Sequence, residues 1–208
     1  MTGVQTCALP ISASRLLIHE SLYDAVLTRL VEKVAALRLG DPLDGNSQMG
    51  PLNSKLHYER VCAMVQKGKD EKARLMIGGG RPKGEQFEKG YWLEPTVFAD
   101  VTPQMTIGRE EIFGPVLSVF KWHDEKEAIA IANSTDYGLT ASIWTNDIKT
   151  AFRMAKAVRS GYIWINGASG HFYGTQFGGM KNSGIGREEG TDELLSYTEV
   201  KMIHIRLT

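Results

Sequence analysis

The chain has two cysteines, which are the first candidates for a nucleophile or a metal ligand. Cys7 and Cys62 have neither the number nor the spacing of a disulfide framework or a metal site. Cys62 falls inside a helical pattern, where cysteine is an ordinary small apolar residue. The cysteine content therefore fits a reducing compartment such as the cytoplasm, and we expect no metal site.

The second candidate for chemistry is the glycine-rich run GIGREEG at positions 184–190. It has the outline of a dinucleotide-binding fingerprint, but its third glycine is one place late and no strand leads directly into the turn. We therefore exclude a fingerprint of this kind. Any nucleotide contact made by this chain must use other residues.

Composition narrows the classes of partner. Lys+Arg and Asp+Glu both number 24, so no net field favours nucleic acid or an anionic membrane. The longest apolar stretches are far short of a membrane span, and the first residues lack the basic start of a secretory signal. A chain of 208 residues can bury the core of one large domain.

The elements that must position the functional residues alternate between strands and helices. Apolar periodicity predicts strands at 15–19, 74–77, 116–120, 140–145 and 162–166, and helices at 21–37, 54–69, 125–134, 150–158 and 192–197. Residues 91–98 should be extended, because Glu94 precedes a proline. The alternation indicates βαβ units, so we expect an α/β fold with a largely parallel sheet covered on both faces.

Five short motifs follow one another in a fixed order. They are EEIFGPV at 110–116, DYGLT at 136–140, WIN at 164–166, FGGMKNSG at 177–184 and YTEVK at 197–201. Together they resemble the aldehyde dehydrogenase superfamily, and the resemblance runs from about Ser14 to the C-terminus. It implies the parallel-sheet catalytic domain of that fold, NAD or NADP as cofactor, a small aldehyde as substrate and a cytoplasmic homo-oligomer, with no nucleic-acid or membrane partner.

The resemblance also assigns the cofactor-binding residues. Glu111 resembles the glutamate that binds the nicotinamide ribose, and Phe113 the aromatic residue beside the nicotinamide. A carboxylate can accept hydrogen bonds from both vicinal hydroxyls, and an apolar ring can hold the flat nicotinamide while excluding water. His57 and Arg60 resemble polar contacts to the same ribose. Their spacing suits one helix face, although a solvated face has the same spacing.

The substrate pocket is expected on the loop 167–176. Asn166 resembles the strand-end asparagine of the family, and the loop after it should shape the aldehyde entrance. Gln176 departs from the pattern, because the family usually has proline there, and this leaves the loop conformation open. The candidate lining residues are His171, Phe172, Tyr173 and Phe177.

The reaction of the family needs a cysteine thiolate and a general-base glutamate. The family pattern places that cysteine five positions before Arg15, which is Pro10, whereas Cys7 lies eight positions before it. We therefore assign no catalytic residue to this chain. The general base and the dinucleotide-binding domain are expected upstream, so this piece alone should be inactive.

The resemblance divides the chain into three parts. Residues 1–12 resemble a translated sequencing-library adapter and are expected to be a non-native or disordered leader. Residues 13–191 form the catalytic domain, and 192–208 a C-terminal helix and oligomerisation strand. In that strand Ile203, Ile205 and Leu207 alternate with polar residues, as on a strand with one apolar face.

Two functions stay open at this point. In the first, the chain is part of an enzyme that oxidises an aldehyde to a carboxylic acid through a cysteine thioester. In the second, it is a non-catalytic interaction fragment that docks on full-length subunits through its last strand. A reading frame that continues upstream into a Gly-Gln-x-Cys segment would favour the first.

Overall fold

The fold is built on one seven-stranded sheet, in which the strands lie in the order β3-β4-β5-β2-β1-β7-β8. The computed structural model describes residues 2–7, as backbone only, and residues 14–208 with their side chains. The seven strands are β1 (Thr2–Cys7), β2 (Arg15–His19), β3 (Arg74–Ile77), β4 (Thr96–Ala99), β5 (Val116–Trp122), β7 (Thr140–Thr145) and β8 (Tyr162–Ile165).

The strand directions confirm a mixed α/β fold with a mostly parallel sheet. β4, β5 and β2 run parallel to one another, as do β7 and β8, while β3 and β1 pair antiparallel with their neighbours. β1 was not expected, since residues 1–12 were predicted to be a non-native or disordered leader. The structure places Thr2–Cys7 as a central strand, whereas residues 1 and 8–13 lie outside the described residues. The non-native origin of the leader stays a prediction.

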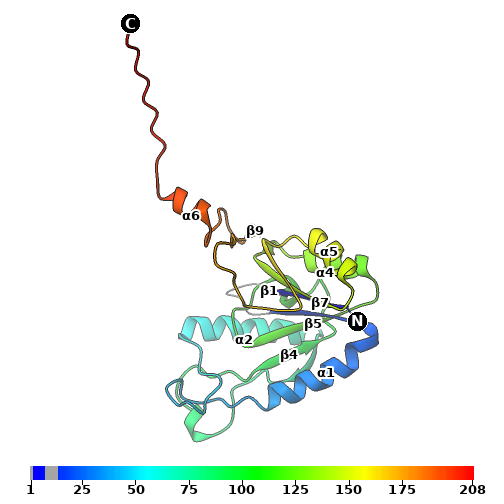
Figure 1. Cartoon of the computed structure of the whole chain (residues 1–208). Coiled ribbons are helices and arrows are strands. Elements are labelled where there is room, and N and C mark those ends of the chain that lie inside the picture. The colour runs from blue at the N-terminus through cyan, green and yellow to red at the C-terminus, as the bar shows by residue number, and fades with distance from the viewer. Residues whose placement is uncertain (1, 8–13) are drawn as a thin grey trace.

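Helices cover both faces of the sheet, as Figure 1 shows. α1 packs on one face, where it buries Tyr23 and Leu27 with Ile18 and Val119 of the strands. The helices α2, α4 and α5 contribute to a second apolar cluster around Leu17 and Phe120. The six helices are α1 (Glu20–Ala35), α2 (Lys55–Asp70), α3 (Thr106–Arg109), α4 (Glu125–Asn133), α5 (Ile148–Ala157) and α6 (Thr191–Ser196), and Glu85–Phe87 forms a short 3-10 turn.

The first two helices are capped by different kinds of side chain. The first helix was predicted to begin at Ser21, but α1 begins at Glu20 and its N-cap is His19, whose Nδ1 accepts from the backbone N–H of Ser21. Imidazole can fill this acceptor role as the usual hydroxyl or carboxylate does. Ser54 does cap α2, since its hydroxyl accepts from the N–H of His57.

Two cations distant in sequence hold the C-terminal end of α4. Arg15 is 5% exposed, and its guanidinium donates to the carbonyl oxygen of Ile131 at 2.7 Å and to the hydroxyl of Ser134 at 3.1 Å. The ammonium of Lys181 donates to the carbonyl oxygens of Asn133 and Thr135. Carbonyls at a helix end lack intrahelical partners and carry partial negative charge, so both contacts stabilise this end.

The C-terminal part projects away from the sheet (Figure 1). β6 (Tyr137–Gly138) pairs with β9 (Met180–Lys181) in a separate two-stranded sheet, and α6 follows. Residues 197–208 are exposed and form no strand with any described part of the chain. The strand expected there is therefore not formed in the isolated chain and stays a prediction for an assembled state.

Candidate functional site

The segment between α3 and β5 carries Glu111 and Phe113. Ile112 lies between them and is buried, so its side chain fixes the segment to the core. Glu111 is itself only 8% exposed, and its Oε1 is buried without a hydrogen-bond partner. Burial raises the pKa of this carboxyl group, and the charge of Glu110 raises it further. An unpaired acceptor of this kind needs a donor that the described residues do not supply.

Phe113 has a backbone conformation that residues other than glycine rarely adopt. Its φ is 55°, in the left-handed region, and its side chain is 45% exposed. A non-glycine residue held there costs about 1–3 kcal/mol, and such strain is concentrated at functional sites. The strained backbone presents an aromatic ring at the surface, where an isolated apolar side chain would bring no benefit to folding.

The helix α2 lies directly beneath this segment. Nε2 of His57 lies 2.6 Å from the carbonyl oxygen of Phe113, and Nδ1 lies 3.0 Å from Oδ1 of Asn53. One turn further along α2, Val61 leaves no room for a side chain at Gly114, because an added Cβ would lie 2.6 Å from its Cγ1. Arg60 is exposed on the same helix. The structure thus brings His57, Glu111 and Phe113 together.

These groups fit one side of a nicotinamide nucleotide. The unpaired Oε1 of Glu111 can accept from a ribose hydroxyl, and the exposed ring of Phe113 can cover an aromatic base. The cavity next to Glu111 measures only about 20 Å³ and also contacts Arg15 and Thr140, which is room for about one water molecule. A cavity of this size does not enclose a nucleotide.

The predicted substrate loop begins at Asn166, which also has a left-handed backbone with φ 54°. Its side chain accepts from the N–H of Thr145 and donates to the carbonyl oxygen of the same residue. The indole N–H of Trp164 donates to the carbonyl oxygen of Gly170 at 2.6 Å. These bonds tie the first part of the loop to the ends of β7 and β8.

The four predicted pocket residues separate into two pairs. His171 stacks on Phe177 with the ring centroids 4.6 Å apart, and its Nδ1 lies 2.8 Å from the carboxylate of Glu189. Phe177 is 7% exposed, so the pair belongs to the packed part of the loop. Phe172 and Tyr173 instead point into solvent, 73% and 107% exposed. The structure therefore does not gather all four around one cavity.

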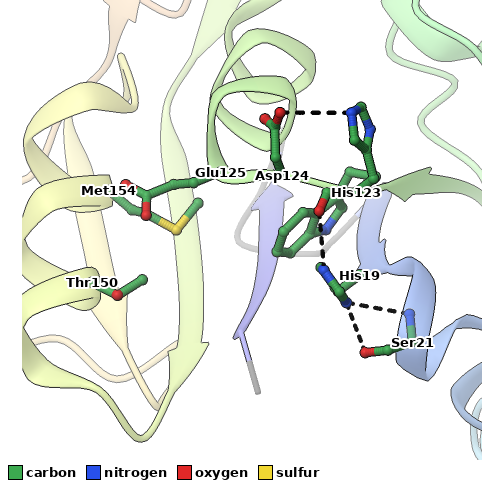
Figure 2. Close-up of a pocket in the computed structure, with 8 residues that line it drawn as sticks. His19, Ser21, His123, Asp124, Glu125, Thr150 and Met154 are labelled. Atoms are coloured by element: carbon green, nitrogen blue, oxygen red, sulfur yellow. Dashed lines mark hydrogen bonds and ion pairs between the residues drawn. The ribbon is translucent and has the colours of Figure 1, made fainter.

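A larger cavity, which sequence reasoning missed, lies where β2 and β5 end. It measures about 400 Å³ and is lined by side chains that include His19, Trp122 and His123 (Figure 2). The register pairs His19 with Trp122. The first strand was predicted to end at His19, but the predicted strand 116–120 stopped two residues before Trp122, so no sequence signal located this cavity. No three His, Cys, Asp or Glu side chains among the described residues are grouped to hold a metal ion.

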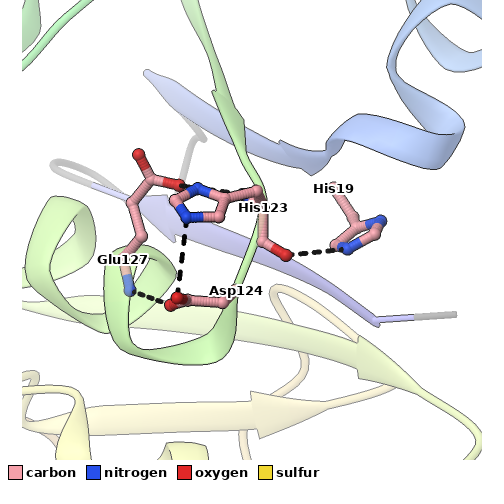
Figure 3. A network of polar contacts seen from close by, with 4 residues as sticks. All are labelled: His19, His123, Asp124 and Glu127. Carbon is pink, nitrogen blue, oxygen red and sulfur yellow. Dashed lines mark hydrogen bonds and ion pairs between the residues drawn. The ribbon is translucent and has the colours of Figure 1, made fainter.

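The rim of this cavity is a polar network (Figure 3). His19 donates from Nε2 to the carbonyl oxygen of His123, while the His123 ring contacts the carboxylates of Glu127 and Asp124. The hydrogen bond to Glu127 raises the pKa of His123. Asp124 also caps α4 by accepting from the N–H of Glu127. The network serves the start of α4, which is a structural role.

The structure describes the side chain of one of the two cysteines, Cys62. Cys62 is half-buried on α2 and packs against the core. Pro10, the position that the family pattern gives to the nucleophile, lies outside the described residues, and so does the side chain of Cys7. A search of the described helices for one long and apolar enough to cross a membrane found none.

The sequence of this chain matches known aldehyde dehydrogenases. The aldehyde dehydrogenase family model matches residues 4–203. The aldehyde dehydrogenase tropH of Talaromyces stipitatus is 47% identical over 98% of the chain and 40% of its own length, and the betaine aldehyde dehydrogenase of Brucella anthropi is 44% identical over 98% and 41%. The chain thus spans about two fifths of the length of the curated relatives it matches.

Solved structures agree with these relatives. An aldehyde dehydrogenase of Mycobacterium tuberculosis complexed with NAD+ superposes with a TM-score of 0.84 at 44% identity, covering 89% of this chain and 38% of that one. A betaine aldehyde dehydrogenase of Staphylococcus aureus in complex with NAD+ gives 0.85 at 36% identity, covering 88% and 37%. On the family match and the relatives together, this chain belongs to the aldehyde dehydrogenase family.

Proposed function

We propose that the protein to which this chain belongs oxidises an aldehyde to a carboxylic acid with NAD or NADP. The observation that carries the proposal is the pairing of an unpaired buried carboxylate oxygen on Glu111 with the strained, exposed ring of Phe113 two residues later. Relatives whose structures contain NAD+ support the choice of cofactor class. The nicotinamide, when bound, supplies the hydride acceptor.

The site residues of this chain act in binding rather than in covalent chemistry. Glu111 accepts from the ribose hydroxyls and so orients the sugar, while Phe113 covers one face of the base and excludes water. Arg60, exposed on the same helix as His57, can reach a polar group of the same nucleotide. On the substrate side, His171 and Phe177 set the conformation of the loop, and Phe172 and Tyr173 are free to meet the aldehyde.

The covalent steps are assigned to groups upstream of this chain. A cysteine thiolate attacks the aldehyde carbon, the resulting thiohemiacetal loses hydride to become a thioester, and water activated by a glutamate releases the acid and the thiol. We therefore expect the 208-residue chain, purified as printed, to turn over no simple aldehyde with either cofactor. Turnover above a blank that disappears in Cys7→Ser would overturn this expectation.

The ribose role of Glu111 can be tested without catalysis. Saturation-transfer NMR with nicotinamide mononucleotide should show contact with the Phe113 ring in the unchanged chain, and Glu111→Gln should weaken it about tenfold, as for loss of one charged hydrogen-bond acceptor. Glu110→Gln is the matched control, because Glu110 is the exposed neighbour. Equal signals from both variants would show that Glu111 does not bind the ribose. In the full-length parent, Glu111→Gln should impair cofactor use more than aldehyde binding.

A second function is supported by the exposed C-terminal segment. Val200, Met202, Ile203, Ile205 and Leu207 are all at least 69% exposed, which is an unusual apolar content for a solvated tail. The alternative is a non-catalytic fragment that docks on full-length subunits, and the same segment supports a homo-oligomer for the parent. Co-purification with a full-length subunit, lost on removing residues 202–208, would favour the docking function.

A further inference from the structure

We infer that His57 is a positioning residue, which holds the backbone of Phe113 in its left-handed conformation and so fixes the direction of the exposed ring. The inference rests on the proposed function only for what the ring contacts. The positioning itself stands on geometry: the two residues lie 56 positions apart in the chain, and the distance from Nε2 to the Phe113 carbonyl oxygen is 2.6 Å.

The hydrogen-bond pattern fixes which ring nitrogen carries a proton. A carbonyl oxygen can only accept, so Nε2 of His57 must be the donor toward Phe113. The partner of Nδ1 is the side-chain amide of Asn53, recorded with Oδ1 at 3.0 Å. Either the ring is an imidazolium that donates to both oxygens, or the amide turns its NH₂ group toward Nδ1. Nε2 is protonated in both cases.

The ring is itself held by the first turn of α2. Ser54 caps the helix at the N–H of His57, and Asn53 precedes that cap. The imidazole is thus fixed at its backbone and at Nδ1, and the remaining nitrogen has one direction in which to donate. A side chain fixed in this way can hold a strained neighbour, whereas a mobile one could not.

The strain at Phe113 needs such a restraint. A left-handed phenylalanine relaxes to an extended or helical backbone unless its surroundings prevent it. The bond from His57 opposes this relaxation by fixing the carbonyl of Phe113 itself. Val61 packs closely on the next residue, since a Cβ added at Gly114 would lie 2.6 Å from its Cγ1. Both restraints come from α2, so this helix acts as the support for the exposed ring.

This assignment differs from a direct contact between His57 and the ribose. Both ring nitrogens already have partners inside the chain, so a ribose hydroxyl would have to displace one of them. Glu111 has the opposite property, since its Oε1 is buried and unpaired. The geometry thus gives ligand binding to Glu111 and the orientation of Phe113 to His57.

The first test uses the unchanged chain. Nitrogen-15 NMR of the histidine rings, at a pH where His57 is neutral, should show the proton on Nε2. A proton on Nδ1 with an unprotonated Nε2 would overturn the inference, because the carbonyl oxygen of Phe113 cannot donate. This measurement does not depend on any variant folding correctly.

The second test compares three variants by hydrogen exchange at the amide of Val116, which donates to the carbonyl oxygen of Gly114 at 2.7 Å. His57→Leu should speed this exchange about tenfold, as expected for loss of one net hydrogen bond. His57→Gln keeps a donor of similar reach and should restore most of the protection. His19→Leu is the matched control, since His19 also donates to a backbone carbonyl, but far from this segment.

The outcomes separate this inference from the proposed function. If His57→Leu leaves the exchange at Val116 unchanged, the positioning role is wrong whatever binds nearby. If the exchange responds as expected while nicotinamide mononucleotide never contacts Phe113 in the unchanged chain, the positioning role stands and the cofactor site is wrong. If the mononucleotide moves the His57 ring resonances without any effect of His57→Leu on the segment, His57 is a direct ligand and the inference fails.

Discussion

The segment Glu111–Gly114 and the tail 197–208 both present apolar side chains to solvent, but they are supported differently. Beneath the first lies α2, which contacts it through His57 and Val61. The tail is exposed along its whole length, and its first residues make only local bonds back to α6. A surface fixed before its ligand arrives loses little entropy on binding, whereas an unsupported segment must become ordered at that moment. The two segments therefore suit different partners: a small rigid ligand for the first, another polypeptide for the second.

Among the changes that test this difference, Gly114→Ala is expected to have the largest effect on stability. The new Cβ would lie 2.6 and 2.9 Å from the two methyl carbons of Val61, a buried residue with little freedom to move. We expect the free energy of unfolding to fall by about 1–3 kcal/mol, together with a shift of the Phe113 resonances. Gly45→Ala, where nothing lies within 4 Å, should leave both unchanged, and denaturant titration of the two variants is the measurement.

A smaller effect, opposite in sign, is expected from Glu111→Gln. Because burial raises the pKa of Glu111 in the folded state, its ionised form opposes folding once the pH exceeds that raised pKa. The variant should be more stable at neutral pH by up to about 1 kcal/mol, and the gain should vanish below the ordinary glutamate pKa of about 4.3. Unfolding curves at several pH values would decide it. A loss of stability at neutral pH would mean that the carboxylate has a partner inside the chain.

The smallest effect on stability, within about 0.5 kcal/mol, is expected from removing residues 202–208. These residues are exposed and bury no core surface, so their removal should leave the free energy of unfolding nearly unchanged. Self-association should respond instead, because an extended apolar segment without a sheet tends to find another edge. Light scattering should report oligomers for the intact chain and fewer for the shortened one. A monodisperse monomer in both cases would leave the tail without a partner.

The sequence predicted most of the sheet and the larger helices because each has a strong period of its own. β3 at Arg74–Ile77 and β7 at Thr140–Thr145 agree residue for residue with the prediction. β4 begins at Thr96 rather than at residue 91, since residues 91–95 form no strand. The short elements α3, β6 and β9 were missed. The four residues of α3 make about one helical turn, and β6 and β9 have two residues each, which is too few to show a period.

The site was predicted in part, and the difference has a physical reason. Motif spacing located Glu111 and Phe113 but could not show that the backbone of Phe113 is left-handed, because that conformation depends on α2 packing from a distant part of the chain. For the same reason the sequence grouped His171 with Phe172 and Tyr173, whereas Glu189 holds His171 apart from them. Contacts between residues far apart in the sequence determine both the backbone of Phe113 and the position of His171, and sequence periodicity does not reveal such contacts.

The contact between Arg15 and the end of α4 has a consequence for the order of folding. Its two partners are 116 positions apart in the chain, and β2 pairs along its length with β5, which is synthesised much later. When the chain leaves the ribosome, β2 therefore appears long before its parallel neighbour exists, and closing so long a loop is slow. During that interval α1 can cover Ile18, but Leu17 belongs to the other apolar cluster and lacks the cover that α4 and α5 later provide. Until α4 emerges and Arg15 can bind its carbonyls, this strand is open to pairing with a chaperone or with another nascent chain.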